Sequence, residues 1–122
     1  QGNQREVMKF TEKVRKKIVA RANGRCEACG SIAMYNQIHH RRPRGMGGSR
    51  DPHSGSAANG LLVHPACHSK IESHREQALE NGQLVRQGID PSTVPVKIGI
   101  SWYLLDHLGG KTRLSGPQTL QS

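Results

Sequence analysis

The stretch NGLLVHPACHSKIESHRE, residues 59–76, carries the local signals that decide the fold. The apolar run at residues 61–63 follows an Asn-Gly turn and is typical of a short buried strand. Pro65 comes next, at a position that suits the first turn of a helix, where a missing backbone N–H costs nothing. We expect this helix to reach about Glu80, because Asn81 and Gly82 supply a helix stop. The stretch therefore predicts a strand that leads directly into a helix.

A second strand and a long loop are expected before this unit. Residues 31–40 favour an extended segment, because Ile32, Met34 and Ile38 are separated by even numbers of positions. Residues 43–60 are rich in Gly, Ser and Pro and form a long loop between the two strands, of a kind that is usually functional or mobile. The pattern so far is strand, loop, strand, helix.

The two ends of the chain complete an α+β arrangement. Residues 4–22 predict a basic amphipathic helix that ends at Asn23-Gly24. Its apolar stripe consists of Val7, Phe10, Val14 and Ile18. Residues 94–105 alternate weakly and predict one or two strands packed on the main body. We therefore expect an N-terminal basic helix (1–24), a core (25–82), a C-terminal β extension (83–108) and a flexible tail (109–122).

Length and composition limit the kinds of protein this chain can be. A chain of 122 residues forms one domain, and its aromatic content of 3% gives it a thin core that needs a disulfide or metal for support. The formal charge of +9 favours a polyanion as partner, although charge can also serve solubility alone. We find no apolar stretch near the ~20 residues of a membrane span, so we expect no membrane partner.

Two pairs of metal-ligand residues have the spacing of a structural zinc site. Cys26 and Cys29 form one pair, and His64 and Cys67 form the other, each with two residues between the ligands. Such pairs predict a zinc knuckle, which suits a reducing compartment better than disulfides do. His64 is the weakest of the four assignments, because another histidine could replace it or the fourth ligand could be absent. The alternative is an isolated thiol pair with Cys67 as a small buried residue.

A second set of polar residues lies between the zinc ligands. His68 directly follows Cys67, and neighbours on a helix are ~100° apart, so the two side chains face different directions. Glu72 is four residues further on and shares a face with His68. Two adjacent histidines, His39 and His40, end the first strand. For two other histidines, at positions 53 and 107, the sequence names no partner.

The sequence contains the segments CEACG, IHHRRPRG and NGLLVHPACHSKIESHRE. Together these segments resemble the HNH endonuclease family, and most closely its small bacteriophage-encoded members. The resemblance covers residues from about Arg25 to Arg75. It implies a ββα-metal (His-Me finger) core held by a structural zinc knuckle, with an N-terminal helix and a short C-terminal β segment added.

The resemblance assigns a role to each polar residue of the second set. His39 matches the first ligand of a catalytic divalent metal, and His40 matches the general base. Asn59 matches the residue whose side chain ties down the loop near the base, and His68 matches a further metal ligand. Glu72 stands where colicin-like members have a histidine, so it could coordinate the metal directly, act through water or only orient His68.

The basic residues after His40 are expected to hold a DNA phosphate. They are Arg41, Arg42 and Arg44, and neighbouring cations also favour the neutral imidazole that a base requires. Adjacent residues on a regular strand point to opposite faces, so both histidines reach one site only if the strand twists or ends there. Pro43 favours an ending, because it lacks a backbone donor and restricts Arg42.

Together these features imply a metal-dependent DNA endonuclease that hydrolyses phosphodiester bonds. One copy would nick DNA and two copies would cut both strands, with Mg²⁺, Mn²⁺, Ni²⁺ or Zn²⁺ as catalytic metal and Zn²⁺ as structural metal. The resemblance implies action on DNA as a monomer or weak dimer in the cytoplasm of a bacterial host, and phage terminase subunits are possible partners in DNA packaging. The alternative is a non-catalytic zinc-dependent nucleic-acid-binding or adaptor module, which would not need His40 or Asn59.

Overall fold

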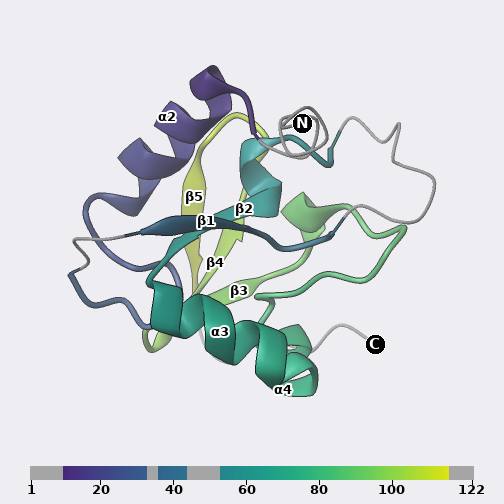
Figure 1. Ribbon diagram of the computed structural model, residues 1–122. Coiled ribbons are helices and arrows are strands. Elements are labelled where there is room, and N and C mark those ends of the chain that lie inside the picture. The colour runs from purple at the N-terminus through teal and green to yellow at the C-terminus, as the bar shows by residue number, and fades with distance from the viewer. Residues whose placement is uncertain (1–9, 33–35, 44–52, 116–122) are drawn as a thin grey trace, which may run out of the picture.

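The computed structural model describes residues 10–32, 36–43 and 53–115 and has a mixed α+β fold with two small antiparallel sheets (Figure 1). The helices are α2 (Glu12–Ala22), α3 (Pro65–Ser73) and α4 (Arg75–Glu80), with 3-10 turns η1 (Ala57–Asn59) and η2 (Pro91–Thr93). The strands are β1 (Gln37–His40), β2 (Gly60–Val63), β3 (Val96–Ile98), β4 (Ser101–Leu105) and β5 (Lys111–Leu114). Figure 1 shows α2 on one side of the β1–β2 sheet and α3 with α4 on the other.

Helix α2 packs tightly against the β1–β2 sheet. Its N-terminus is capped by Thr11, whose Oγ1 accepts a hydrogen bond from the backbone N–H of Val14 at 3.2 Å. Ile18 is fully buried and joins Phe10 in a small apolar cluster with β2. A Cβ atom on Gly60 would lie 2.5 Å from Ile18 Cδ1, so a larger residue would require the Ile18 side chain to move.

A buried ion pair connects α2 to the turn that follows it and to β2. The Arg21 guanidinium lies 2.6 Å from the Glu27 carboxylate, and both side chains are 1% exposed. Arg21 also donates to the carbonyls of Ala57 and Gly60, and Glu27 accepts from the backbone N–H of Leu62. These hydrogen bonds satisfy both charges, which is the condition for burying them.

The strand-to-helix unit forms as predicted, but the helix is interrupted. Strands β1 and β2 pair antiparallel, with His39 opposite Leu61 and His40 opposite Gly60. The predicted single helix to Glu80 breaks at His74, whose backbone is non-helical (φ −125, ψ 64). The Ser73 hydroxyl, which bonds the Lys70 carbonyl and the His74 ring, offers a local alternative to helix continuation.

The end of α4 requires glycine, as the sequence indicates. Gly82 has a φ of +74, and a Cβ atom there would lie 1.9 Å from the carbonyl oxygen of Pro95. The close approach brings the C-terminal extension against the helix, where Leu84 and Val96 are buried with Ala78 in the main core. The core cluster contains no Phe or Trp, in keeping with the thin core expected from composition.

Two segments differ from the predicted layout. Regular pairing in the first strand begins only at Gln37, while Ile32 forms an isolated bridge with Arg25, and residues 33–35 lie outside the described part. The predicted flexible tail is wrong at residues 111–114, because β5 pairs with β4 over four residues. The polar sequence of this segment gives no clear strand signal, because the strand is held by backbone pairing more than by apolar burial.

In the described residues, no helix has the length and apolar character needed to cross a membrane.

Candidate functional site

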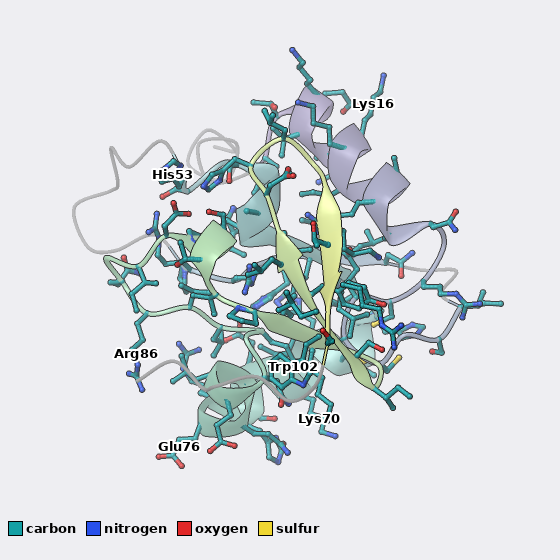
Figure 2. The ribbon with its side chains drawn as sticks, turned by 180° about the vertical axis from the view of Figure 1, so that it is seen from behind. Lys16, His53, Lys70, Glu76, Arg86 and Trp102 are labelled. Atoms are coloured by element: carbon teal, nitrogen blue, oxygen red, sulfur yellow. The ribbon has the colours of Figure 1, made fainter. Side chains whose placement is uncertain are left out.

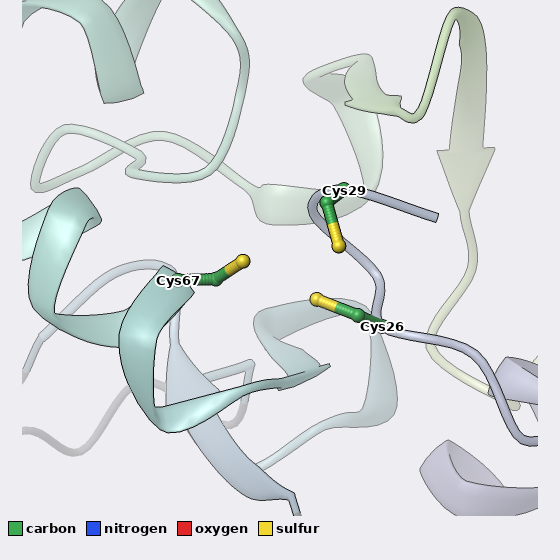
Figure 3. Close-up of side chains that lie close together, drawn as sticks. All are labelled: Cys26, Cys29 and Cys67. Carbon is green, nitrogen blue, oxygen red and sulfur yellow. The ribbon is translucent and has the colours of Figure 1, made fainter. Parts of the chain in front are cut away.

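The three cysteines converge on one point between α2 and α3. Figure 3 shows the sulfur atoms of Cys26 and Cys29, from the turn after α2, and of Cys67, from the first turn of α3, turned toward one another. The three sulfur atoms lie within 4.8 Å of one another, close enough to hold a metal ion. We call Cys26, Cys29 and Cys67 the Cys group. Thiolate ligands at this separation fit a structural zinc ion.

The pKa values of Cys29 and Cys67 are shifted in opposite directions within the Cys group. Burial raises the pKa of the Cys29 thiol, but hydrogen bonds from Ser31 and from the other two cysteines outweigh it and lower the pKa to about 7. Burial, together with hydrogen bonds and repulsion from the other two thiols, raises the pKa of Cys67 to about 12. Thiols must lose their protons to bind a metal, and the charge of a divalent cation would stabilise all three thiolates together.

His64 is not among the residues whose ligand atoms converge in the Cys group, so its role as fourth zinc ligand stays a prediction. Its ring nitrogen Nε2 lies 3.2 Å from the hydroxyl of Ser31, which in turn lies 3.0 Å from Cys29 Sγ. The backbone N–H of His64 donates to Cys26 Sγ at 3.5 Å. His64 is the N-cap residue of α3, and its ring contacts Ser31 beside the three sulfur atoms.

A second group brings together residues from β1 and α3. It consists of His39, His68 and Glu72, whose ligand atoms lie within 4.8 Å of one another, and we call it the His group. The Glu72 Oε2 atom lies 3.9 Å from His39 Nδ1 and 3.8 Å from His68 Nε2. His39 is only 2% exposed, whereas the side chains of His68 and Glu72 are 33% and 50% exposed. The group is therefore closed on the sheet side and open toward solvent.

Hydrogen bonds to oxygen fix the orientation of both imidazoles in the His group. The Nε2 atom of His39 lies 2.8 Å from the carbonyl oxygen of Gln83, which can only accept, so Nε2 carries the proton. His68 Nδ1 lies 2.7 Å from the amide oxygen of Gln37 and donates to it in the same way. The nitrogens that these hydrogen bonds leave, His39 Nδ1 and His68 Nε2, both face the Glu72 carboxylate. This is the arrangement by which proteins orient metal-binding histidines.

The charge state of His39 agrees with a ligand role. Burial lowers its pKa to about 4, and the nearby His68 adds to that decrease, while the Gln83 carbonyl opposes it. His39 is therefore neutral at neutral pH and offers a lone pair on Nδ1. His39 Nδ1 and the Glu72 carboxylate oxygen then face each other as two acceptors, and a cation between them would relieve their mutual repulsion.

Asn59 fixes the chain directly after the two histidines. Its side chain is fully buried and forms two hydrogen bonds with the backbone of Arg42, accepting from the N–H at 2.8 Å and donating to the carbonyl at 3.1 Å. It also donates to the Ser54 carbonyl at 2.9 Å, and its own carbonyl accepts from Arg41 N–H. Asn59 thus determines where β1 ends and where the following loop starts.

His40 lies apart from the His group. Its half-buried ring stacks on Phe10, with centroids 4.1 Å apart and an interplanar angle of 11°. His39 faces α3 and His40 faces the segment before α2, as strand alternation dictates. The expectation that the end of the strand would turn both histidines to one site is therefore not met among the described residues.

Two of the three arginines predicted to hold phosphate are buried, which corrects that assignment. Arg41 is 0% exposed, and burial lowers its pKa to about 9, which still leaves a cation at neutral pH. Its guanidinium donates at 2.8–3.0 Å to the carbonyls of Gly82, Ala58, Pro91 and Val94. Arg42 is 3% exposed and donates to the Ile89 carbonyl at 2.7 Å. Arg44 lies outside the described residues.

A third group was not foreseen from the sequence. His53, Asp90 and His107 offer ligand atoms within 4.8 Å of one another, although they are distant in the chain. Neither histidine has a ligand-type spacing to another metal-binding residue, so no local signal could have revealed the group.

Comparisons with protein-family models, with characterised proteins and with solved structures give no match for this chain. A functional argument therefore depends on the chemistry and geometry of its own residues.

Proposed function

We propose that this protein is a metal-dependent DNA endonuclease of the HNH type, in which β1, β2 and α3 form the ββα-metal core. The observation that carries the proposal is the His group, in which two oriented imidazole nitrogens face one carboxylate oxygen at 3.8–3.9 Å. Since structural zinc sites are closed and catalytic sites keep open positions, the exposed side of the His group suits catalysis. The Cys group would hold the separate structural Zn²⁺.

In the proposed enzyme, the His group and two residues outside it, His40 and Asn59, would divide the reaction among them. His39, His68 and Glu72 would hold the catalytic cation, which would supply positive charge to the phosphate oxygens and the departing 3′ oxygen. His40 would accept the proton of the attacking water through the part of its ring that Phe10 leaves uncovered, because imidazole titrates near neutral pH. Asn59 would keep the backbone after His40 in place.

Exposed cations support DNA as the substrate. Lys13, Arg15 and Lys16 lie on the solvent side of α2, and Figure 2 shows Lys16 projecting away from the body. Arg75, 55% exposed, bonds Glu72 at 3.1 Å and lies beside the His group, where it could contact a phosphate in place of the buried Arg41. Contacts to phosphate position DNA without reading its sequence, so we expect weak sequence preference. One copy would nick, two copies would cut both strands, and the setting would be phage DNA packaging beside the terminase in the bacterial cytoplasm.

A second candidate function is a non-catalytic zinc-dependent nucleic-acid-binding or adaptor module. The stacking of His40 on Phe10, away from the His group, favours it, because a general base must reach the water it activates. The buried guanidiniums of Arg41 and Arg42 favour it as well, because they are not available to a scissile phosphate.

Cleavage of supercoiled plasmid separates the two candidates. We would incubate the protein with plasmid and Mg²⁺, Mn²⁺ or Ni²⁺, with EDTA as the metal-free control, and follow nicked and linear products. His40→Ala should lower the rate by about 10²–10⁴-fold, the usual contribution of a general base, and His68→Ala should abolish cleavage while the fold persists. His74→Gln is the matched control, because this exposed histidine bonds Ser73 instead of the His group.

Two results would overturn the nuclease proposal. Cleavage that persists in both His40→Ala and His68→Ala would show that the activity has another origin. DNA binding without cleavage in any metal would establish the binding module.

A further inference from the structure

Three distant segments meet at the side of the molecule where the C-terminal extension contacts the loop before η1. His53 begins the described segment that leads to η1, Asp90 is the N-cap residue of η2, and His107 lies in the turn between β4 and β5. Figure 2 shows His53 at the edge of the molecule near that turn. None of the three residues belongs to the Cys group or the His group.

The side chains of this group are arranged around one carboxylate. His107 Nε2 lies 2.8 Å from Asp90 Oδ1, and His53 Nε2 lies 3.7 Å from Asp90 Oδ2. The two imidazole rings stack with centroids 4.0 Å apart and an interplanar angle of 12°. The exposed fractions of the side chains are 40% for His53, 36% for Asp90 and 27% for His107, so small ions can reach them.

Neighbouring groups hold the carboxylate and one ring in place. Asp90 Oδ1 accepts from the backbone N–H and the hydroxyl of Ser92, both at 2.9 Å. His107 Nδ1 lies 2.5 Å from the hydroxyl oxygen of Ser56. Because the Asp90 carboxylate can only accept, Nε2 of His107 carries the proton in this contact. An ion that binds Nε2 would replace that proton, and Nδ1 would then carry a proton and donate it to Ser56, as in other metal sites where oxygen orients the histidine.

We propose that His53, Asp90 and His107 form a binding site for a further divalent transition-metal ion of the zinc class. Ligands at about 2.0–2.2 Å from a tetrahedral Zn²⁺ lie about 3.3–3.5 Å apart. The 3.7 Å between His53 Nε2 and Asp90 Oδ2 is close to this separation. The 2.8 Å between His107 Nε2 and Asp90 Oδ1 is that of a hydrogen bond, and it must lengthen when an ion replaces the proton. The rings must tilt out of their parallel stack so that both lone pairs point to one ion.

The chemistry of the ligands selects the class of ion. Two imidazoles with one carboxylate suit Zn²⁺ or Ni²⁺, whereas Mg²⁺ and Ca²⁺ prefer sites built from oxygen atoms.

A metal ion at this site would connect the C-terminal extension to the segment whose Ser54 carbonyl accepts a hydrogen bond from Asn59. Ser54 follows His53, and its carbonyl accepts from Asn59 Nδ2 at 2.9 Å. The ion would therefore restrain the start of the segment that carries Ser54 and Ser56. This role is structural and does not depend on nuclease activity.

Zinc binding to the full chain tests the proposal. We would titrate ZnCl₂ into protein that already carries one equivalent of zinc for the Cys group, in a His68→Ala background that removes the His group, and measure both the zinc stoichiometry and the melting temperature. His53→Gln and His107→Gln should each bind one zinc equivalent fewer than the background protein. Zinc should also raise their melting temperature less than it raises that of the background protein, because a ligand stabilises only the state that binds it.

His74→Gln, in the same background, is the matched control and should leave zinc stoichiometry unchanged. Glutamine keeps much of the size and polarity of histidine, and circular dichroism would verify that each variant is folded. Unchanged stoichiometry in both His53→Gln and His107→Gln would overturn the site and leave a hydrogen-bonded contact only. Neither readout involves DNA cleavage, so failure here is distinct from failure of the proposed nuclease.

Discussion

The Cys group and the His group share one helix but offer different ligand atoms, three thiols in the first and two imidazoles with one carboxylate in the second. Cys67 and His68 are adjacent on α3, yet one turns toward the thiols and the other toward β1, because neighbouring helical residues are ~100° apart. Each group has one buried member, Cys26 or His39, and one exposed member, Cys29 or Glu72. The two groups therefore differ in ligand chemistry more than in their access to solvent.

The surroundings of the Cys group and the His group predict different effects when one of their ligand residues is substituted. The Cys group is continuous with the main core and lies beside the buried Arg21–Glu27 ion pair. The His group is oriented by Gln83 and Gln37 at the edge of the β1–β2 sheet, and its open side faces solvent. We therefore expect the first to support folding and the second to support ion binding.

The largest expected effect comes from Cys26→Ser. If the Cys group holds zinc, its loss removes metal-binding free energy of about 10 kcal/mol or more, comparable to the whole stability of a small domain. The variant should lose its cooperative thermal transition, measured by circular dichroism, and a strong zinc chelator should have the same effect on the unsubstituted protein. If the melting temperature of Cys26→Ser stays within a few degrees of that of the unsubstituted protein, the Cys group does not support folding in the way we expect.

A smaller effect is expected from pH through His39. Burial holds its folded pKa near 4 against an ordinary value of 6.5, so the unfolded chain takes up the proton first as pH falls. The resulting stability is present above pH 6.5 and is lost as pH falls toward 4, by roughly 2–3 kcal/mol. A bound metal acts in the same direction, because it also requires neutral imidazole.

Urea unfolding at pH 7 and pH 4.5 measures this pH dependence. His39→Gln should lose less stability over the interval than the unsubstituted protein, and the difference between the two isolates His39 from other acid effects. Equal losses would mean that His39 is not held neutral by the fold.

The smallest expected effect concerns the hydrogen bond that orients His68. Gln37→Leu removes the oxygen that accepts from His68 Nδ1, and loss of such a partner typically weakens metal binding by about 10–100-fold. Calorimetric titration of Mn²⁺ into protein carrying one equivalent of zinc would measure the change. Gln77→Leu, at an exposed position of α4, is the matched control. Equal affinities for the two variants would show that Gln37 does not orient His68.

The sequence by itself determined the elements whose signals are local. The strand at residues 60–63 and the helix after it follow from an apolar run, Pro65 and a terminal glycine. The separation of Cys67 from His68, and the pairing of His68 with Glu72, follow from helical periodicity. Each of these features depends on residues only a few positions apart, where backbone geometry alone fixes the relation.

The tertiary structure decided the roles of Arg41 and His107. In the sequence, Arg41 is one of several basic residues in a loop, but the fold surrounds it with carbonyls from residues 17 to 53 positions away. His107 likewise meets Ser56 and Asp90 across separations of 51 and 17 residues. Local periodicity cannot encode such contacts, because the burial of a side chain and its hydrogen-bond partners depend on how whole segments pack together.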